Sequence, residues 1–348
     1  MATICIPKEI KDGEWRVSLA PSEVAALVKN GHEVYVETMA GRASGFLDGT
    51  YEDAGAVVEY GAHIYKGNAL IIKVKELDPC EFPRVKPRSA IMLFAHFGTY
   101  QRQKEFFDNA SAKGITAIPY EDITIHGRTP ILAVMSKCAG EVAAHIACEY
   151  LRYNHIRPGI TVSGWDYGGP GILPSDAVVS IIGAGNAGWS AKDVLAPLVS
   201  EIHLFDIIHK RMPSYPHVLV HHAAENAYAL HLPHSDVIIC AAIGKRHTPK
   251  IITDEQVAYL KENTLIIDIA IDEGGNCAFS RPTTHKDPIF IYKGIRVYAV
   301  PNIPGAIPRS ATPRLSKVLF PFVERAAELM DKNKRAVSTE EVTQSFLE

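Results

Sequence analysis

The sequence lacks an excess of positive charge, closely paired cysteines and any long apolar run. Lys and Arg number 36 against 39 Asp and Glu, so the formal net charge is -3, which argues against sequence-independent binding to nucleic acid. The six cysteines form no CxxC pair, and we interpret them as buried thiols in a reducing compartment. No stretch approaches the ~18 apolar residues of a membrane span, and the N-terminus has no signal-peptide pattern. These absences predict a cytoplasmic protein without nucleic-acid or membrane partners.

What is present is the composition of an ordinary folded protein. The chain has 348 residues, 47% hydrophobic and 22% charged, which suggests about two domains. Short β-branched runs alternate with helical patterns, and these runs are apolar nearly throughout, as in parallel strands covered on both faces. The expected strands are 3–6, 33–36, 70–74, 91–94, 115–118, 178–182, 202–205, 237–240 and 265–269. The alternation predicts an α/β protein with mostly parallel sheets.

Two segments mark the expected passages between domains. Apolar residues recur at helical spacing over 136–153, between a Gly/Pro loop at 127–130 and a glycine-rich stretch at 164–171. The proline-rich segment 301–308 is expected to interrupt regular structure, and a final apolar helix follows at 315–330. The predicted division is therefore one domain formed by residues 1–133 and 304–348, with a second domain, residues 134–303, inserted in it.

The strongest local signal is a strand that runs into a GxGxxG turn and a helix. The strand 178–182 precedes the turn, the helix 189–198 follows it, and Asp206 ends the next strand, 23 residues after the first glycine of the turn. This arrangement is typical of a dinucleotide-binding turn, whose helix N-terminus holds the pyrophosphate. An acid at position 206 favours NAD over NADP, although Lys210 and Arg211 are nearby in the sequence. The predicted cofactor-binding residues of this unit are Gly183, Gly185, Asn186, Ala187, Gly188 and Asp206. A tight turn without a ligand is the alternative.

Motifs outside this unit carry a resemblance to a known family. They include Ile6-Pro7-Lys8-Glu9, Glu14-Trp15-Arg16-Val17, Lys73-Val74-Lys75-Glu76, Asp268-Ile269-Ala270-Ile271-Asp272-Glu273-Gly274-Gly275 and Asn302-Ile303-Pro304-Gly305-Ala306. With them, the sequence resembles the alanine dehydrogenase and transhydrogenase α-subunit family from residue 3 to about residue 325. The resemblance implies two Rossmann-like domains, with an NAD domain inserted in a catalytic domain, and a homo-oligomer.

The resemblance also implies roles for individual residues. It places Arg16 and Lys75 at the substrate carboxylate, His96 as the catalytic acid and base, and Asp272 beside the reacting carbon. Phe94, Leu132 and Met135 would bound the substrate side chain, while Ser136, Asn302 and Ile303 would lie near NAD. Among the residues themselves, Lys73 competes with Lys75 for its role, whereas Asp268 within its strand is interpreted as structural.

The chemistry of these residue types is consistent with an amino-acid dehydrogenase. Arg and Lys neutralise a carboxylate, a His that titrates near neutrality transfers protons, and a carboxylate stabilises a cationic iminium. The resemblance therefore implies NAD-dependent oxidative deamination of a small L-amino acid, alanine or similar, to a 2-oxo acid and ammonia.

Two alternatives to this function stay open. The segment 97–101 looks more like saccharopine dehydrogenases, and in an opine- or saccharopine-type enzyme Tyr100 would line a pocket for a second amino acid. The other alternative is a non-catalytic nucleotide-binding module of the transhydrogenase type.

Histidines are frequent between positions 203 and 247. They show no metal-ligand spacing such as HExxH. We therefore expect a solvated face and no metal site.

Overall fold

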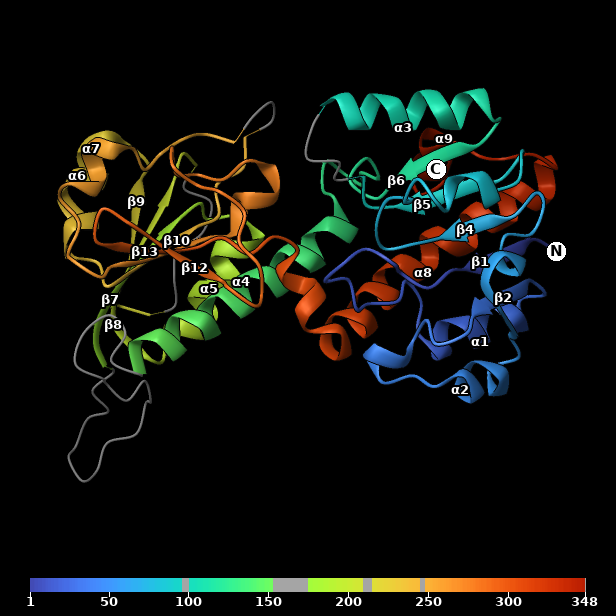
Figure 1. Cartoon of the computed structure of the whole chain (residues 1–348), viewed down its shortest axis with the longest axis horizontal. Helices are drawn as coiled ribbons and strands as arrows, with labels where there is room; N and C mark the ends of the chain where they lie inside the picture. The colour runs from blue at the N-terminus through green and yellow to red at the C-terminus, as the bar shows by residue number, and fades with distance from the viewer. Residues whose placement is uncertain (96–99, 153–174, 209–214, 245–247, 348) are drawn as a thin grey trace. The chain divides into compact units, whose positions relative to one another are not determined.

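The computed structural model describes residues 1–95, 100–152, 175–208, 215–244 and 248–347. The chain folds as two compact units, the first made of Met1–Met135 and Pro304–Glu348 and the second of Ser136–Ile303. Both units are α/β, and Figure 1 shows their strands and helices. The predicted α/β class with mostly parallel sheets is confirmed.

The sheet of the first unit has six strands among the described residues, in the order β3-β2-β1-β4-β5-β6, and every neighbouring pair is parallel. The strands are β1 Thr3–Ile6, β2 Glu33–Glu37, β3 Val57–Glu59, β4 Leu70–Ile72, β5 Ala90–Leu93 and β6 Thr116–Pro119. The chain builds outward from β1 to β3 and then resumes at β4 on the other side of β1. The order thus reverses between β1 and β4, and ligands of open α/β sheets bind at the carboxyl ends of such strands.

The helices of the first unit include a long C-terminal one. They are α1 Pro21–Lys29, α2 Asp48–Asp53, α3 Tyr100–Ala112, α8 Pro308–Asn333 and α9 Thr339–Gln344. The expectation that 301–308 interrupts regular structure is wrong in part, because Ile303–Ala306 is a 3-10 turn and α8 begins at Pro308. Proline suits the first helical position, where its missing N–H has no helical partner.

The second unit has seven described strands in the order β12-β13-β11-β10-β7-β8-β9. They are β7 Ser175–Ile182, β8 Val199–Asp206, β9 Val218–His222, β10 Val237–Cys240, β11 Leu265–Asp268, β12 Ile289–Tyr292 and β13 Ile295–Tyr298. Only the β12–β13 pair is antiparallel among these strands. Its turn, Lys293-Gly294, has positive φ at both residues, which suits a two-residue hairpin. The helices are α5 Asn186–Leu195, α6 Glu225–His231 and α7 Asp254–Val257.

The helix α4, Pro130–Arg152, starts in the first unit and continues into the second. Its length and composition would allow it to cross a membrane, and 44% of its most apolar window is buried. Ala143, Ala144, Ala147 and Leu151 on this helix belong to the hydrophobic core of the second unit. Packing against the sheet therefore accounts for its apolar face.

The expectation of a solvated histidine face is wrong for His203. This residue lies in β8 and is 4% exposed. The side chains of β8 and β9 meet because the two strands pair in parallel, with Phe205 opposite His221. Strand pairing, which the spacing along the sequence does not reveal, brings these histidines together.

Candidate functional site

A buried ion pair lies in the segment that follows β1. Arg16 donates from Nε to Oε1 of Glu14 at 2.7 Å and from Nη2 to Oε2 at 2.5 Å. Both residues are buried, and the two parallel hydrogen bonds hold the guanidinium in one plane. Arg16 Nη1 also donates to Sδ of Met135 at 3.0 Å. The structure thus brings together two predicted site residues, Arg16 and Met135.

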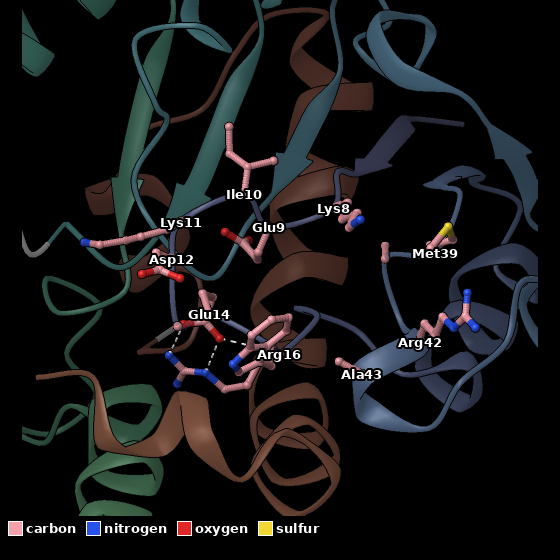
Figure 2. A pocket seen from close by; sticks show the side chains of 13 residues that line it. Lys8, Glu9, Ile10, Lys11, Asp12, Glu14, Arg16, Met39, Arg42 and Ala43 are labelled. Carbon is pink, nitrogen blue, oxygen red and sulfur yellow. Dashed lines mark hydrogen bonds and ion pairs between the residues drawn. The ribbon is translucent and has the colours of Figure 1, made fainter. Parts of the chain in front are cut away.

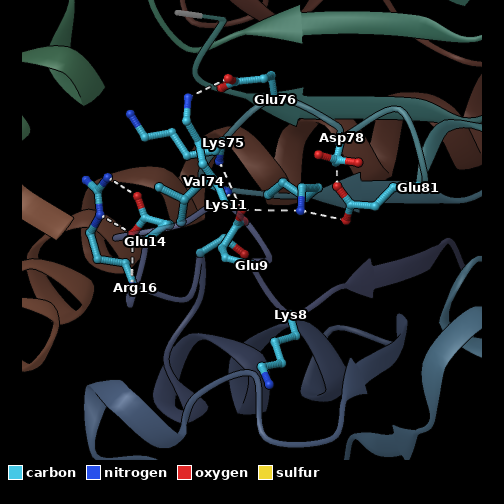
Figure 3. A network of polar contacts seen from close by, with 12 residues as sticks. Lys8, Glu9, Lys11, Glu14, Arg16, Val74, Lys75, Glu76, Asp78 and Glu81 are labelled. Carbon is cyan, nitrogen blue, oxygen red and sulfur yellow. Dashed lines mark hydrogen bonds and ion pairs between the residues drawn. The ribbon is translucent and has the colours of Figure 1, made fainter. Parts of the chain in front are cut away.

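Lys75 lies in the segment after β4 and is 5% exposed. Figure 3 shows a network of polar contacts in which Lys75 lies on the same side as Glu14 and Arg16. Burial opposes the ionisation of Glu14, but the charges of Arg16 and Lys75 and the hydrogen bonds from Arg16 outweigh it and lower the pKa of Glu14. Two cations, Arg16 and Lys75, therefore act on the carboxylate of Glu14 at this edge of the sheet. The family resemblance implies that these same two residues bind the substrate carboxylate.

Lys73 belongs to a different arrangement. Its Nζ lies 3.2 Å from Oε2 of Glu9 and 2.9 Å from Oε1 of Glu81, and all three side chains are buried. Desolvation opposes the charge of Lys73, yet the attraction of Glu9 and Glu81 raises its pKa. Glu9 in turn accepts a hydrogen bond from the backbone N–H of Val74 at 2.6 Å. Because two carboxylates already neutralise Lys73, Lys75 is the better candidate for an external carboxylate.

A pocket of about 630 Å³ opens beside these residues (Figure 2). Its walls come from the segment after β1 and from the segment after β2. Exposed cations and acids face it together with the buried Glu14–Arg16 pair. The lining includes Lys8, Glu9, Lys11, Asp12, Glu14, Arg16 and Arg42.

The residues predicted to bound the substrate side chain also lie in the first unit. Phe94 follows β5, is buried and meets the Tyr120 ring edge-on with a centroid distance of 4.9 Å. Met135 is buried and Leu132 is half-buried, both on α4. Tyr100 begins α3. His96, the segment 97–99, the glycine-rich stretch 164–171, Lys210 and Arg211 lie outside the described residues.

In the second unit, the GxGxxG turn joins β7 to α5 as predicted. Gly183 has φ +101°, and a Cβ on it would lie 2.7 Å from the backbone of Ala241. A Cβ on Gly188 would lie 1.8 Å from the carbonyl oxygen of Gly183, whereas one on Gly185 would meet nothing within 4 Å. Gly183 and Gly188 thus permit close packing within the protein, and Gly185 leaves open space at the N-terminus of α5. Asn186 and Ala187 form the first turn of this helix. A diphosphate fits such a cradle.

Asp206 ends β8 and is tied to this turn. Its Oδ2 accepts a hydrogen bond from the N–H of Ala184 at 2.7 Å, and its Oδ1 accepts one from Ile208 at 2.9 Å. The carboxylate therefore lies beside the glycine turn, where the adenosine ribose of a dinucleotide is held in Rossmann folds.

Asp272 and Asn302 are brought together after β11. Asp272, in the 3-10 turn Ile269–Glu273, accepts the N–H of Asn302 at 3.0 Å and is exposed. Asn302 has φ +58°, Ile303 is buried and Ser136 is half-buried. Asp268, by contrast, is buried and accepts the N–H of Asn276 at 2.9 Å. It therefore orders the loop that follows β11, in the structural role expected for it.

Sequence reasoning assigned no role to Glu14, Glu9 and Glu81. The first two stand in motifs that carried the family resemblance, but neither motif indicates which cation its acid faces. No sequence motif pointed to Glu81. Strand order decides the pairing, since Glu9 and Lys73 are 64 residues apart and follow adjacent strands β1 and β4.

The chain matches two family models. Residues 5–139 match "Alanine dehydrogenase/PNT, N-terminal domain", and residues 157–347 match "Alanine dehydrogenase/PNT, C-terminal domain".

Curated relatives match most of the chain. Alanine dehydrogenase of Mycolicibacterium smegmatis is 32% identical over 331 residues, which are 93% of this chain and 87% of that protein. Alanine dehydrogenase of Geobacillus stearothermophilus is 33% identical over 341 residues, covering 96% and 88%. Alanine dehydrogenase 2 of Staphylococcus aureus is 34% identical over 328 residues, covering 92% and 86%.

Solved structures share the fold of the whole chain. An L-alanine dehydrogenase superposes with a TM-score of 0.84 at 29% identity and covers 99% of both chains. A transhydrogenase from Sinorhizobium meliloti superposes with a TM-score of 0.78 at 23% identity, covering 97% of this chain and 98% of its own, and supports the fold alone. With both of its halves matched by family models and with relatives at 32–34% identity along more than nine-tenths of its length, the chain belongs to the alanine dehydrogenase/PNT family.

Proposed function

We propose that this protein is an NAD-dependent amino-acid dehydrogenase. It oxidises a small L-amino acid, alanine or similar, with water to a 2-oxo acid and ammonium, and it catalyses the reverse reductive amination. The observation that carries the proposal is the placement of buried Arg16 and Lys75 at the carboxyl edge of the first sheet. Near-full-length relatives named alanine dehydrogenase support it.

In this proposal the first unit is the substrate domain. Arg16 and Lys75 neutralise the substrate carboxylate, and Glu14 holds the guanidinium plane in position through two hydrogen bonds. Phe94, Leu132 and Met135 limit the size of the substrate side chain. The size limit set by these three side chains favours a small 2-oxo acid over a bulky one.

The second unit is the proposed nucleotide domain. Gly183, Gly185, Asn186, Ala187 and Gly188 would hold the diphosphate, while Asp206 would hold the adenosine ribose. Ser136, Asn302 and Ile303 would lie near the cofactor. When NAD is bound, its nicotinamide would accept the hydride from the substrate.

Proton transfer and charge stabilisation fall to two further side chains. We assign His96 the exchange of protons during water addition and ammonia loss, as the family resemblance implies. Asp272 would stabilise the cationic iminium of the substrate.

We further propose that the protein acts in the cytoplasm as a homo-oligomer.

The test is oxidation of NADH with pyruvate, glyoxylate or 2-oxoglutarate, each with ammonium or with a panel of amino acids. Turnover with pyruvate and ammonium is expected. Turnover only when an amino acid supplies the amine would replace the proposal by an opine-type reaction. NADH binding without any turnover would leave a non-catalytic module instead.

Two variants then test the carboxylate site. Arg16→Lys removes the planar fork, so the KM for pyruvate should rise roughly tenfold or more, as expected for a charged hydrogen bond worth about 1.5–3 kcal/mol, while the KM for NADH stays unchanged. Lys104→Gln is the matched control, because Lys104 is an exposed cation of the same unit that pairs with Asp108 and does not line this pocket. An unchanged KM for pyruvate in Arg16→Lys would contradict the assigned role.

A further inference from the structure

Three histidines converge on one face of the sheet in the second unit. His203 lies in β8, His221 in β9 and His231 at the end of α6. The ring centroids of His203 and His221 each lie 4.2 Å from that of His231. One candidate ligand atom from each residue lies within 4.8 Å of the other two. Figure 1 shows β9 and α6 in this unit.

The two nitrogens of His203 face different partners. Its Nδ1 lies 2.9 Å from Nε2 of His221, whereas its Nε2 lies 3.1 Å from Oε1 of Glu201. When Nε2–H donates to Glu201, the lone pair of Nδ1 points at the other histidines. A histidine that donates one N–H to a carboxylate and offers the second nitrogen to a common point is the usual arrangement of a histidine that binds a metal.

We propose that His203, His221 and His231 form a binding site for a borderline transition-metal cation of the Zn²⁺ class, with Glu201 orienting His203. Imidazole nitrogens are preferred ligands of such cations, and three protein ligands with water in the fourth position form a tetrahedral zinc site. Two nitrogens on one tetrahedral zinc lie about 3.4 Å apart. The observed spacing requires side-chain adjustments of about one ångström.

One of the three rings is packed against an aromatic side chain. Phe205 stacks on His221 with a centroid distance of 5.0 Å and so covers one face of that ring.

A bound cation would link three elements that are separate in the chain. β8, β9 and α6 each contribute one ligand, so binding should stabilise this part of the unit and raise its melting temperature. The site uses none of the residues assigned to the proposed reaction. Its presence or absence is therefore independent of the proposed function.

The experiment is calorimetric titration of the chelator-treated full chain with ZnCl₂. Wild type should bind one Zn²⁺ per chain with a rise in melting temperature, and Co²⁺ in its place should give the visible absorption bands of a tetrahedral site. His231→Gln, at a half-buried position on α6, should abolish this binding. Glu201→Gln should lower the affinity roughly tenfold by loosening His203.

His222→Gln is the matched control, because His222 is an exposed histidine next to His221 in β9. It should bind zinc as wild type does. Equal melting temperatures of the metal-free variants establish that His231→Gln is folded, and His221→Gln provides a second test of the same site. Absence of stoichiometric zinc binding by wild type, or equal binding by wild type, His231→Gln and His221→Gln, would overturn the proposal.

Discussion

The candidate sites of the two units depend on different kinds of chemical group, side chains in the first and backbone in the second. In the first unit, the site depends on buried and paired side-chain charges: Arg16 pairs with Glu14 in the site, and Lys73 pairs with Glu9 and Glu81 in the neighbouring arrangement. In the second unit, backbone geometry at the glycine turn forms it, and Asp206 reinforces the turn by accepting backbone N–H groups.

The difference teaches which kind of site is sensitive to which change. Buried charges depend on every partner, because removing one leaves another charge without compensation in a medium of low dielectric constant. A glycine turn depends on space, because an added methyl group either collides with backbone or occupies the room meant for a ligand. Charge-removing variants should therefore affect the first unit most, and volume-adding variants the second.

The largest expected effect is that of Lys73→Met. This change leaves Glu9 and Glu81 buried without their cation, so the free energy of unfolding of the first unit should fall by about 3–5 kcal/mol. Urea denaturation measures it. Lys11→Met, which breaks the more exposed Lys11–Glu76 pair, should cost only ~0–1 kcal/mol. Equal losses in the two variants would remove the contrast between buried and exposed pairs.

Gly188→Ala should have the next largest effect. Its Cβ would collide with the carbonyl oxygen of Gly183, so we expect a loss of about 1–3 kcal/mol in stability together with weaker NADH binding. Gly185→Ala is the matched variant. With no protein atom within 4 Å of its Cβ, it should keep wild-type stability and lose roughly tenfold in NADH affinity, or about 1.4 kcal/mol. Fluorescence titration with NADH and thermal melting separate the two outcomes. A stable Gly185→Ala variant with wild-type NADH affinity would contradict the assigned phosphate cradle.

The smallest expected effect is the acid sensitivity that Glu14 confers. Burial alone would raise the pKa of this carboxyl, but Arg16 and Lys75 hold it below the ordinary value of 4.5. A group with a lowered folded pKa stabilises the fold above its unfolded pKa, and this contribution is lost as the pH falls through the folded value. The first unit should therefore lose stability below pH 4.5, and Glu14→Gln should show a shallower acid dependence. Unfolding free energies measured across this pH range would contradict the assignment if both proteins followed the same curve.

Much of the fold could be predicted because local patterns specify it. All nine expected strands are present, with ends that differ by a few residues, and the apolar runs correctly indicated parallel sheets. The hairpin β12–β13 was missed, although Lys293-Gly294 is a recognisable two-residue turn. The start of α8 at Pro308 was missed because a proline-rich segment was interpreted as an interruption and not as a helix start.

The candidate site was less predictable from the sequence. Arg16, Lys75 and the glycine turn could be named in advance. Glu14 as the partner of Arg16 could not be named, and neither could the convergence of His203, His221 and His231. These groupings involve partners on different strands and helices or a choice among several nearby acids, and no spacing rule covers them.

The sequence by itself determined the α/β class and the GxGxxG turn between β7 and α5. Each of these follows from contiguous residues whose backbone preferences and hydrophobic pattern act locally. Only the tertiary structure decided that Lys73 is neutralised by Glu9 and Glu81, that Lys75 acts on the Glu14–Arg16 pair, and that three histidines share one face. The physical reason is strand order: placing β4 beside β1, and β9 beside β8, brings side chains distant in sequence within a few ångströms of one another.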